Sequence, residues 1–156
     1  MKNVADVTEC PVRDYIFSEI ARCAATDPTM LAAMRVRAAE RRGRTLLRRA
    51  KIARGARADA IALANGLIRP GVVQFVEPEI VCGTGLYMVR DGQPCILIAK
   101  THGRAAREFI IAHEIAEWAI GSTTYDNEND CNLLAAELLV PGCLKPLAPE
   151  VRELLS

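Results

Sequence analysis

Long apolar runs are missing from this sequence of 156 residues, although 51% of its residues are hydrophobic. No stretch approaches the roughly 18 consecutive apolar residues of a membrane-spanning helix, so we expect no membrane-embedded segment. The N-terminus also lacks a basic stretch followed by an apolar one, which is the pattern of a secretory signal. Together these absences favour a cytoplasmic protein with an ordinary hydrophobic core.

Paired cysteine motifs are also absent. Six cysteines are spread along the chain, and no CxxC pair occurs. A chain of this length and apolar content can be stable without disulfides, so we expect reduced thiols rather than a disulfide framework.

Charge of one sign is scarce or absent in each of two regions. Residues 35–57 contain ten Arg and Lys but a single acidic residue, Glu40, whereas residues 108–130 contain six acidic residues and no Arg or Lys. The basic region lacks the interleaved aromatic residues of a single-strand binder and shows no clear helix-turn-helix pattern. Three interpretations stay open: a solvated helix face, a surface for nucleic-acid phosphate, or a docking site for an acidic protein.

Helices are expected to dominate the first part of the chain, because apolar residues recur there at helical spacing. Thr26 or Asp27 is expected to cap the second helix, with Pro28 in its first turn and Gly43 at its end. The predicted helices span residues 11–25, 28–43 and 45–54, the last with a continuation that stops at Asn65-Gly66.

The pattern changes to strands after Gly71, where segments rich in Val, Ile and aromatic residues are separated by turn residues. Asp91-Gly92 predicts a hairpin between the second and third strands. The predicted strands span residues 72–76, 80–89 and 95–99, and two helices follow at about 103–120 and 127–139. The sequence therefore predicts an α+β fold in which N-terminal helices precede a small, mostly antiparallel three-stranded sheet and two final helices.

A metal-peptidase motif in altered form lies in the first of those final helices. The stretch REFIIAHEIAEWAIG, residues 107–121, begins as HExxH but has Glu117 in place of the second histidine. Because residues four apart share one helix face, His113 and Glu117 point the same way. In HExxH sites the histidines bind the metal and the intervening Glu accepts a proton from water, a role that Glu114 matches.

A third ligand is available on the last helix. Glu128 begins a continuous face there, and packing of that face against the first helix would bring its carboxylate to the site. In this part of the chain, HEIAE followed by ENDCNLLAAELLVP (128–141) resembles the ImmA/IrrE family of metallopeptidases, whose pattern is HExxH followed by approximately ExxAxxFAxxLLxP. Glu128 matches that family's third ligand, and Cys131 and Leu134 replace its usual Ala and Phe.

The resemblance implies a zincin-like arrangement over residues 53–156, with residues 1–52 as a helical, Arg-rich region outside it. It implies a metallo-endopeptidase in which His113, Glu117 and Glu128 hold a divalent metal and Glu114 acts as general base and then acid. The family's usual substrates are helix-turn-helix repressors, so a regulatory protease with a transcriptional repressor as protein partner is implied.

The replacement of a ligand by Glu117 changes the expected chemistry. One imidazole and two carboxylates carry a charge of about −2, which neutralises a divalent cation and acidifies its bound water less than a His-rich set does. Zinc is the metal that the resemblance implies, while manganese or ferrous iron suits the Glu-rich set. The alternative function is a catalytically inactive family member that binds a partner, with nucleic-acid contact through residues 35–57. A metal-dependent hydrolase of another substrate is a third interpretation.

Simpler interpretations remain for each candidate residue. A His-Glu pair is common on helices, so His113 can be purely structural. His102 can supply an imidazole to the site or lie on the surface, and Tyr125 can steady an oxyanion or belong to an ordinary loop. Gly83 and Gly85 are better explained by a bend in a strand than by a phosphate loop, because no helix start follows them.

Overall fold

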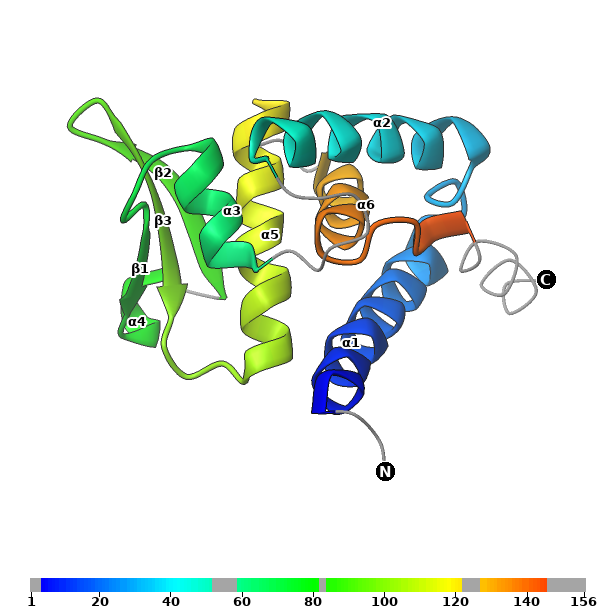
Figure 1. Ribbon diagram of the computed structural model, residues 1–156, viewed down its shortest axis with the longest axis horizontal. Helices are drawn as coiled ribbons and strands as arrows, with labels where there is room; N and C mark the ends of the chain where they lie inside the picture. Colours follow the sequence, from blue (N-terminus) through cyan, green and yellow to red (C-terminus); the bar gives the residue numbers. More distant parts are fainter. Residues whose placement is uncertain (1–3, 52–58, 82–83, 122–126, 146–156) are drawn as a thin grey trace.

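The computed structural model describes residues 4–51, 59–81, 84–121 and 127–145, and side chains from residue 11 onward (Figure 1). These residues form six helices and one three-stranded sheet, which confirms the predicted α+β class. The helices are α1 (Val4–Thr26), α2 (Ala33–Arg49), α3 (Ala60–Leu67), α4 (Pro78–Val81), α5 (Arg104–Ile120) and α6 (Glu128–Leu139). The strands are β1 (Val73–Val76), β2 (Gly85–Arg90) and β3 (Gln93–Ala99).

The sheet is mixed, with strand order β1-β3-β2. Strands β2 and β3 form the expected antiparallel hairpin, in which Asp91 and Gly92 have φ angles of 52° and 76°. Two consecutive positive φ angles are typical of the two-residue turn that Asp-Gly favours. Strand β1 pairs with β3 in parallel, because the chain crosses over between them instead of turning directly back.

The prediction of one strand over residues 80–89 was wrong at its start. Residues 78–81 form the short helix α4, in which Pro78 occupies the first position, and strand β2 begins only at Gly85. The Ile80 N–H donates to the Glu77 carbonyl, and Val81 is buried against the sheet. Proline at a helix start leaves no donor unsatisfied, so local turn chemistry overrides the β propensity of Ile and Val here.

The first helices also differ from the prediction. Helix α1 starts well before residue 11 and includes Pro11, and α2 starts at Ala33 rather than after Asp27. The Asp27 carboxylate accepts hydrogen bonds from the Thr29 backbone and hydroxyl, which closes a turn instead of capping a helix. Helix α2 continues past Gly43, since that residue is buried against Glu137 of α6 and needs no C-terminal turn.

Helix α5 is central to the molecule (Figure 1). The sheet and α3 lie on one side of it, α6 and α1 on the other, and α2 runs across α6. One hydrophobic core connects these elements from Val12 of α1 to Leu144, so α1 and α2 share it with the later elements. The expected domain boundary near residue 52 lies outside the described residues.

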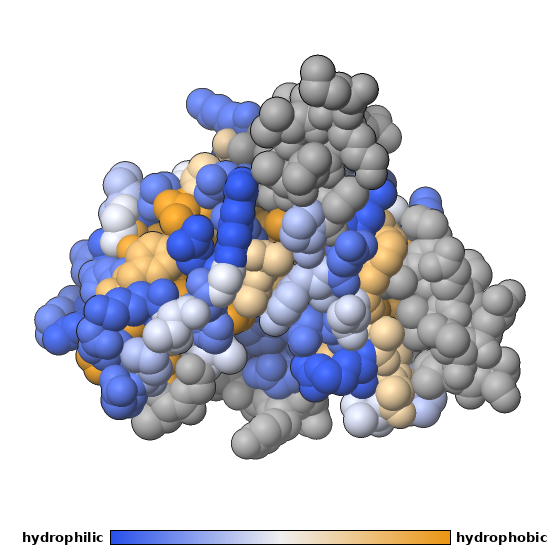
Figure 2. All heavy atoms as spheres, turned by 90° about the horizontal axis from the view of Figure 1, so that it is seen from below, coloured by the Kyte–Doolittle hydropathy of each residue, from blue (hydrophilic) through white to orange (hydrophobic). Residues whose placement is uncertain are grey.

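The end of the molecule that contains the sheet lies at the left in Figure 2, and its surface carries apolar side chains among polar ones. The large exposed hydrophobic residues of this end are Phe75, Ile80, Leu86 and Val89. None of the helices in the described ranges combines the length and apolar character that a bilayer crossing requires.

Gly85 allows strand β2 to approach α5 closely. A Cβ atom at this position would lie 2.7 Å from Ile110 Cγ2 and 3.0 Å from Ile98 Cδ1. We therefore expect Gly85→Ala to lower the free energy of unfolding by about 1–3 kcal/mol, the usual range for overpacking, as measured by urea denaturation.

Gly66 in α3 provides the matched control. Among the described residues, the neighbour within 4 Å of an added Cβ is Ala50 at 3.9 Å, so Gly66→Ala should raise stability by up to about 1 kcal/mol through helix propensity. Equal effects of the two substitutions would contradict the close approach of β2 and α5.

Candidate metal centre

Helix α5 presents the motif residues on the side that meets α6. It begins after Gly103 and ends at Gly121, whose φ of 74° is the left-handed conformation of a helix C-cap. Ile111 and Ile115 are fully buried in the core, which fixes the rotation of the helix about its axis. His113 and Glu117, one turn apart, are thereby directed toward α6 and remain only slightly exposed.

Helix α6 supplies the facing side chains. It begins at Glu128, one residue after the predicted start. Its fully buried leucines, among them Leu134 and Leu138, hold it in the core. Glu128 and Asn132 are four residues apart and therefore share the face that is directed at α5.

Three side chains from the two helices converge on one point. His113 Nε2 lies 3.3 Å from Glu117 Oε1 and 3.2 Å from Glu128 Oε2. One nitrogen and two carboxylate oxygens of these residues all lie within 4.8 Å of one another. The structure thus brings together the three residues that the sequence singled out as metal ligands.

These separations suit ligands around an ion. Ligand atoms of a tetrahedral site with bonds of about 2.1 Å lie about 3.4 Å apart, close to the separations at His113 Nε2. Charge-assisted hydrogen bonds are shorter, about 2.7–2.9 Å. In the absence of an ion, the single Nε2–H would have to be shared between the two carboxylate oxygens as a three-centre hydrogen bond. Glu128 is half exposed, so one side of the cluster is open to solvent.

Asn132 orients the imidazole. His113 Nδ1 lies 2.8 Å from Asn132 Oδ1, and because the amide oxygen only accepts, Nδ1 must carry the proton and donate. This hydrogen bond leaves Nε2 as the ligand atom in a neutral imidazole, which is the usual arrangement around metal-bound histidines. The Asn132 amide nitrogen in turn donates to Cys23 Sγ of α1 at 3.4 Å.

The electrostatics of the cluster favour positive charge between the carboxylates. Burial lowers the pKa of His113, but Glu117, Glu114 and Glu128 outweigh burial and raise this pKa to about 9. The hydrogen bond from His113 holds the pKa of Glu117 below its ordinary value. A proton therefore occupies His113 at neutral pH in the metal-free protein, and a cation would replace it.

Glu114 lies beside this cluster and is almost fully buried, with 5% exposure. Burial, together with the charge of Glu117, raises its pKa to about 8, and the Tyr87 backbone N–H donates to its carboxylate. The Glu117 side chain also contacts the Glu114 carboxyl group, but the Oε2 atom of Glu114 has no hydrogen-bond partner of good geometry among the described residues. An ion at the cluster would lower this pKa, and a water molecule bound there would supply the missing partner, so the residues fit a hydrated cation.

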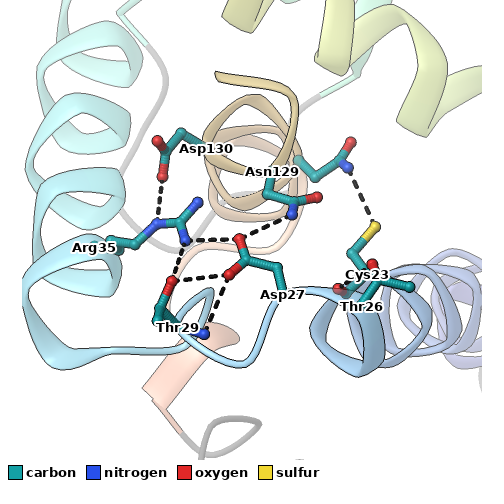
Figure 3. A network of polar contacts seen from close by, with 8 residues as sticks. Cys23, Thr26, Asp27, Thr29, Arg35, Asn129 and Asp130 are labelled. Atoms are coloured by element: carbon teal, nitrogen blue, oxygen red, sulfur yellow. Dashed lines mark hydrogen bonds and ion pairs between the residues drawn. The ribbon is translucent and has the colours of Figure 1, made fainter. Parts of the chain in front are cut away.

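A polar network around Arg35 holds the start of α6 (Figure 3). The guanidinium donates to Asp130 Oδ1 at 2.9 Å and to Asp27 Oδ2 at 2.8 Å, so one side chain joins α6 to the turn before α2. Asn129 also donates to Asp27 Oδ2, at 3.0 Å. The network ties down the residues that directly follow Glu128 and so restricts where its carboxylate can lie.

The other predicted candidates lie elsewhere. His102 Nε2 is 3.2 Å from the Thr84 carbonyl, and His102 is not part of the three-residue cluster. Gly85 is the first residue of β2, in agreement with the expectation that it belongs to a strand and not to a phosphate loop. Gly83 and Tyr125 lie outside the described residues. Among the described cysteines, Cys23, Cys95, Cys131 and Cys143 are unpaired.

Cys131 lies close to the cluster in sequence but does not suit a ligand role. Burial, reinforced by the charges of Glu117 and Glu128, raises its pKa to about 12. Its sulfur is not among the three ligand atoms that converge at the cluster.

Sequence reasoning missed the supporting roles of Asn132, Arg35 and Asp27. It had Asp27 only as a candidate helix cap and Arg35 only as part of the basic run. Asn132 could have been found from its spacing, because it follows Glu128 by four residues and so lies on the ligand face. Arg35 and Asp27 gave no such signal, since their partners Asp130 and Asn129 are about a hundred residues away in the chain.

Compared with protein families, with curated proteins and with solved structures, the chain gives no match. The site is therefore described by its geometry alone, as an imidazole and two carboxylates beside a buried third carboxylate.

The metal-free protein should become less stable as the pH rises. Because the folded-state pKa of His113, about 9, exceeds the ordinary 6.5, its stabilisation is complete below pH 6.5 and is lost as the pH rises through 9. The raised pKa of Glu114 acts in the same direction, between 4.5 and about 8. Urea denaturation with a chelator, at pH values from about 6 to 9.5, measures this loss.

Two variants make that test specific. Glu117→Gln removes the partner that most raises the pKa of His113, so the loss of stability with pH should shrink. His102→Gln, outside the cluster, should leave it unchanged. An undiminished loss in Glu117→Gln would contradict the assigned pairing.

Arg35→Ala should lower the free energy of unfolding by about 1–3 kcal/mol, because Asp27 and Asp130 lose their charged partner in a partly buried site. It should also weaken divalent-metal binding through Glu128, measured by calorimetric titration. Arg22→Ala is the control: its pair with Glu19 is exposed and contributes at most about 1 kcal/mol. Equal effects of the two substitutions on stability and metal binding would count against the network.

Proposed function

We propose that the protein is a metal-dependent peptidase of the ImmA/IrrE type, acting in the cytoplasm as a regulatory protease. The observation that supports this most is the convergence of His113, Glu117 and Glu128 beside the buried Glu114. The four residues combine a ligand set with a carboxylate positioned to handle a proton, which is what metal-assisted hydrolysis requires.

His113, Glu117 and Glu128 would hold the divalent ion. When bound, such an ion polarises a carbonyl group and acidifies water. Zinc is favoured by the family resemblance, whereas two carboxylates in a set of three suit manganese or ferrous iron. Asn132 keeps His113 in the tautomer that leaves Nε2 available.

Glu114 is the proposed general base and then acid. Its Tyr87 contact fixes the carboxylate, while the unpartnered Oε2 is the atom that would take and return the proton. A pKa raised to about 8 in the metal-free protein keeps the group protonated at neutral pH. Positive charge at the cluster would favour the ionised form of Glu114, so binding of the metal ion would also prepare Glu114 to act as a base.

Strand β2 suggests that the substrate is an extended peptide. It lies at the edge of the sheet, and no other described strand pairs with its outer side. The Ala99 N–H donates to the Thr84 carbonyl, which sets the hydrogen-bonding register of β2 and β3. The backbone N–H and C=O groups of every second residue from Leu86 onward therefore face β3, while those of Gly85, Tyr87 and Val89 face away from it. The Tyr87 N–H meets Glu114, and a peptide added along this edge would pass the proposed base. A helix-turn-helix repressor is the substrate that the family resemblance suggests.

A non-catalytic binding protein is the second candidate. The protonated His113 already balances part of the charge of Glu117 and Glu128, so the cluster can exist without a cation. In that case the fold would serve partner binding alone.

The proposal predicts cleavage that depends on a metal and on Glu114. The chelated protein, reloaded with Zn²⁺ or Mn²⁺, should cut a proteome-derived peptide library, as detected by mass spectrometry. Glu114→Gln should lose at least about 100-fold in rate, the usual loss for a general base, while it binds the metal with unchanged stoichiometry.

Two further variants decide between the candidates. Glu77→Gln, which alters an exposed carboxylate paired with Lys100, should cut at the wild-type rate. If the wild-type protein binds no divalent metal while Glu117→His does, the peptidase proposal fails and the binding protein is supported. Undiminished cleavage by Glu114→Gln would refute the role of that residue.

A further inference from the structure

Helix α2 carries most of its positive charge on the outside of the molecule. It lies across α6 (Figure 1) and packs inward through Val36, Ala39, Gly43 and Leu46. The basic residues from position 37 to 51 are all exposed; they are Arg37, Arg41, Arg42, Arg44, Arg48, Arg49 and Lys51. We call these seven residues the α2 basic face.

The seven charges have few partners within the fold. Burial raises the pKa of Glu137, and the charge of Arg44 acts against that rise. Among the described residues, none of the seven forms an ion pair with a carboxylate; the Nε atoms of Arg37 and Arg48 donate to carbonyls of their own helix. Arg35, at the start of the same helix, is different because it is enclosed by Asp27 and Asp130. The one acidic residue of the helix, Glu40, is partly buried near Lys145 and does not neutralise the face.

The spacing of the face suits an extended polyanion. Arg37, Arg41, Arg44 and Arg48 follow at intervals of four, three and four residues, which gives one straight stripe along the helix. At a rise of about 1.5 Å per residue the stripe is about 16 Å long, and a helix of ordinary width enters a major groove about 12 Å wide. Arginine side chains are the preferred contacts of phosphate groups.

The composition of the face argues against a protein partner. Between residues 37 and 51 the exposed residues are the seven basic ones and Thr45. The large exposed hydrophobic residue of α2, Met34, lies at the start of the helix, before the face begins, and has no apolar companion within the face. Stable protein interfaces depend on a central cluster of buried apolar or aromatic side chains, which this face does not offer. Helix α2 also has no aromatic residue, so stacking on single-stranded bases has no basis here.

We infer that the α2 basic face binds the phosphate backbone of duplex DNA without sequence preference. This inference is independent of the metal centre, because none of the seven residues contacts His113, Glu114, Glu117 or Glu128 in the polar interactions described above. Guanidinium contacts to phosphate position a protein on the duplex, and they make its affinity strongly dependent on salt.

The test is fluorescence anisotropy of the full chain with a labelled mixed-sequence 20-base-pair DNA duplex, at several salt concentrations. The variant R41Q/R44Q/R48Q should weaken binding at least about tenfold at low salt and reduce the slope of log affinity against log salt by about 2.7, or 0.9 for each lost contact. R13Q/R90Q/R104Q removes three exposed arginines outside α2 and should retain the wild-type slope. Circular dichroism and thermal unfolding check that both variants are folded.

Two competing probes complete the experiment. An RNA duplex has a deep and narrow major groove, so it should bind more weakly than the DNA duplex. An RNA duplex that binds as tightly as DNA, or more tightly, would overturn the inference. Binding of polyglutamate as tightly as either duplex would overturn the inference in favour of an acidic protein. Equal losses in the two triple variants, or wild-type binding that does not change with salt, would also overturn it.

Discussion

The hydrogen bond between His113 Nδ1 and Asn132 Oδ1 is the contact on which the candidate site depends. It joins α5 to α6 at the level of the cluster, fixes the tautomer of the imidazole, and leaves Nε2 directed at Glu117 and Glu128. The packing of the two helices makes this hydrogen bond available, because Ile111 and Ile115 on one side and Leu134 and Leu138 on the other are buried without exposure. A rotation of either helix by one residue, about 100°, would separate the ligands.

Arginine serves two different purposes in helix α2. Arg35 is partly buried between two aspartates and stabilises the start of α6, where its loss would leave charges without partners. The α2 basic face is solvent-exposed, so its mutual repulsion is reduced by water and salt, and its arginines cost the fold little. A charge run in the sequence thus contains one structural residue, Arg35, and several exposed ones.

Local signals predicted the elements near the site well. The expected helices at about 103–120 and 127–139 match α5 and α6 to within a residue, and Asp91-Gly92 marked the hairpin, because each depends on the conformational preference of its own residues. The parallel pairing of β1 with β3, the continuation of α2 past Gly43 and the Arg35 network depend on residues distant in sequence. No local pattern encodes those contacts. The three candidate ligands could be named from helix periodicity, whereas the orienting role of Asn132 needed the distance across the helix pair.

The central claim is that one imidazole and two carboxylates hold a divalent cation. X-ray absorption spectroscopy of the protein loaded with one equivalent of Zn²⁺ or Mn²⁺ tests it most directly, because the spectrum reports the ligand types around the ion. The claim predicts a shell of oxygen and nitrogen with a single imidazole and no sulfur, although Cys23 and Cys131 lie nearby on α1 and α6. Two or more imidazoles, a sulfur ligand, or no specifically bound ion would contradict it.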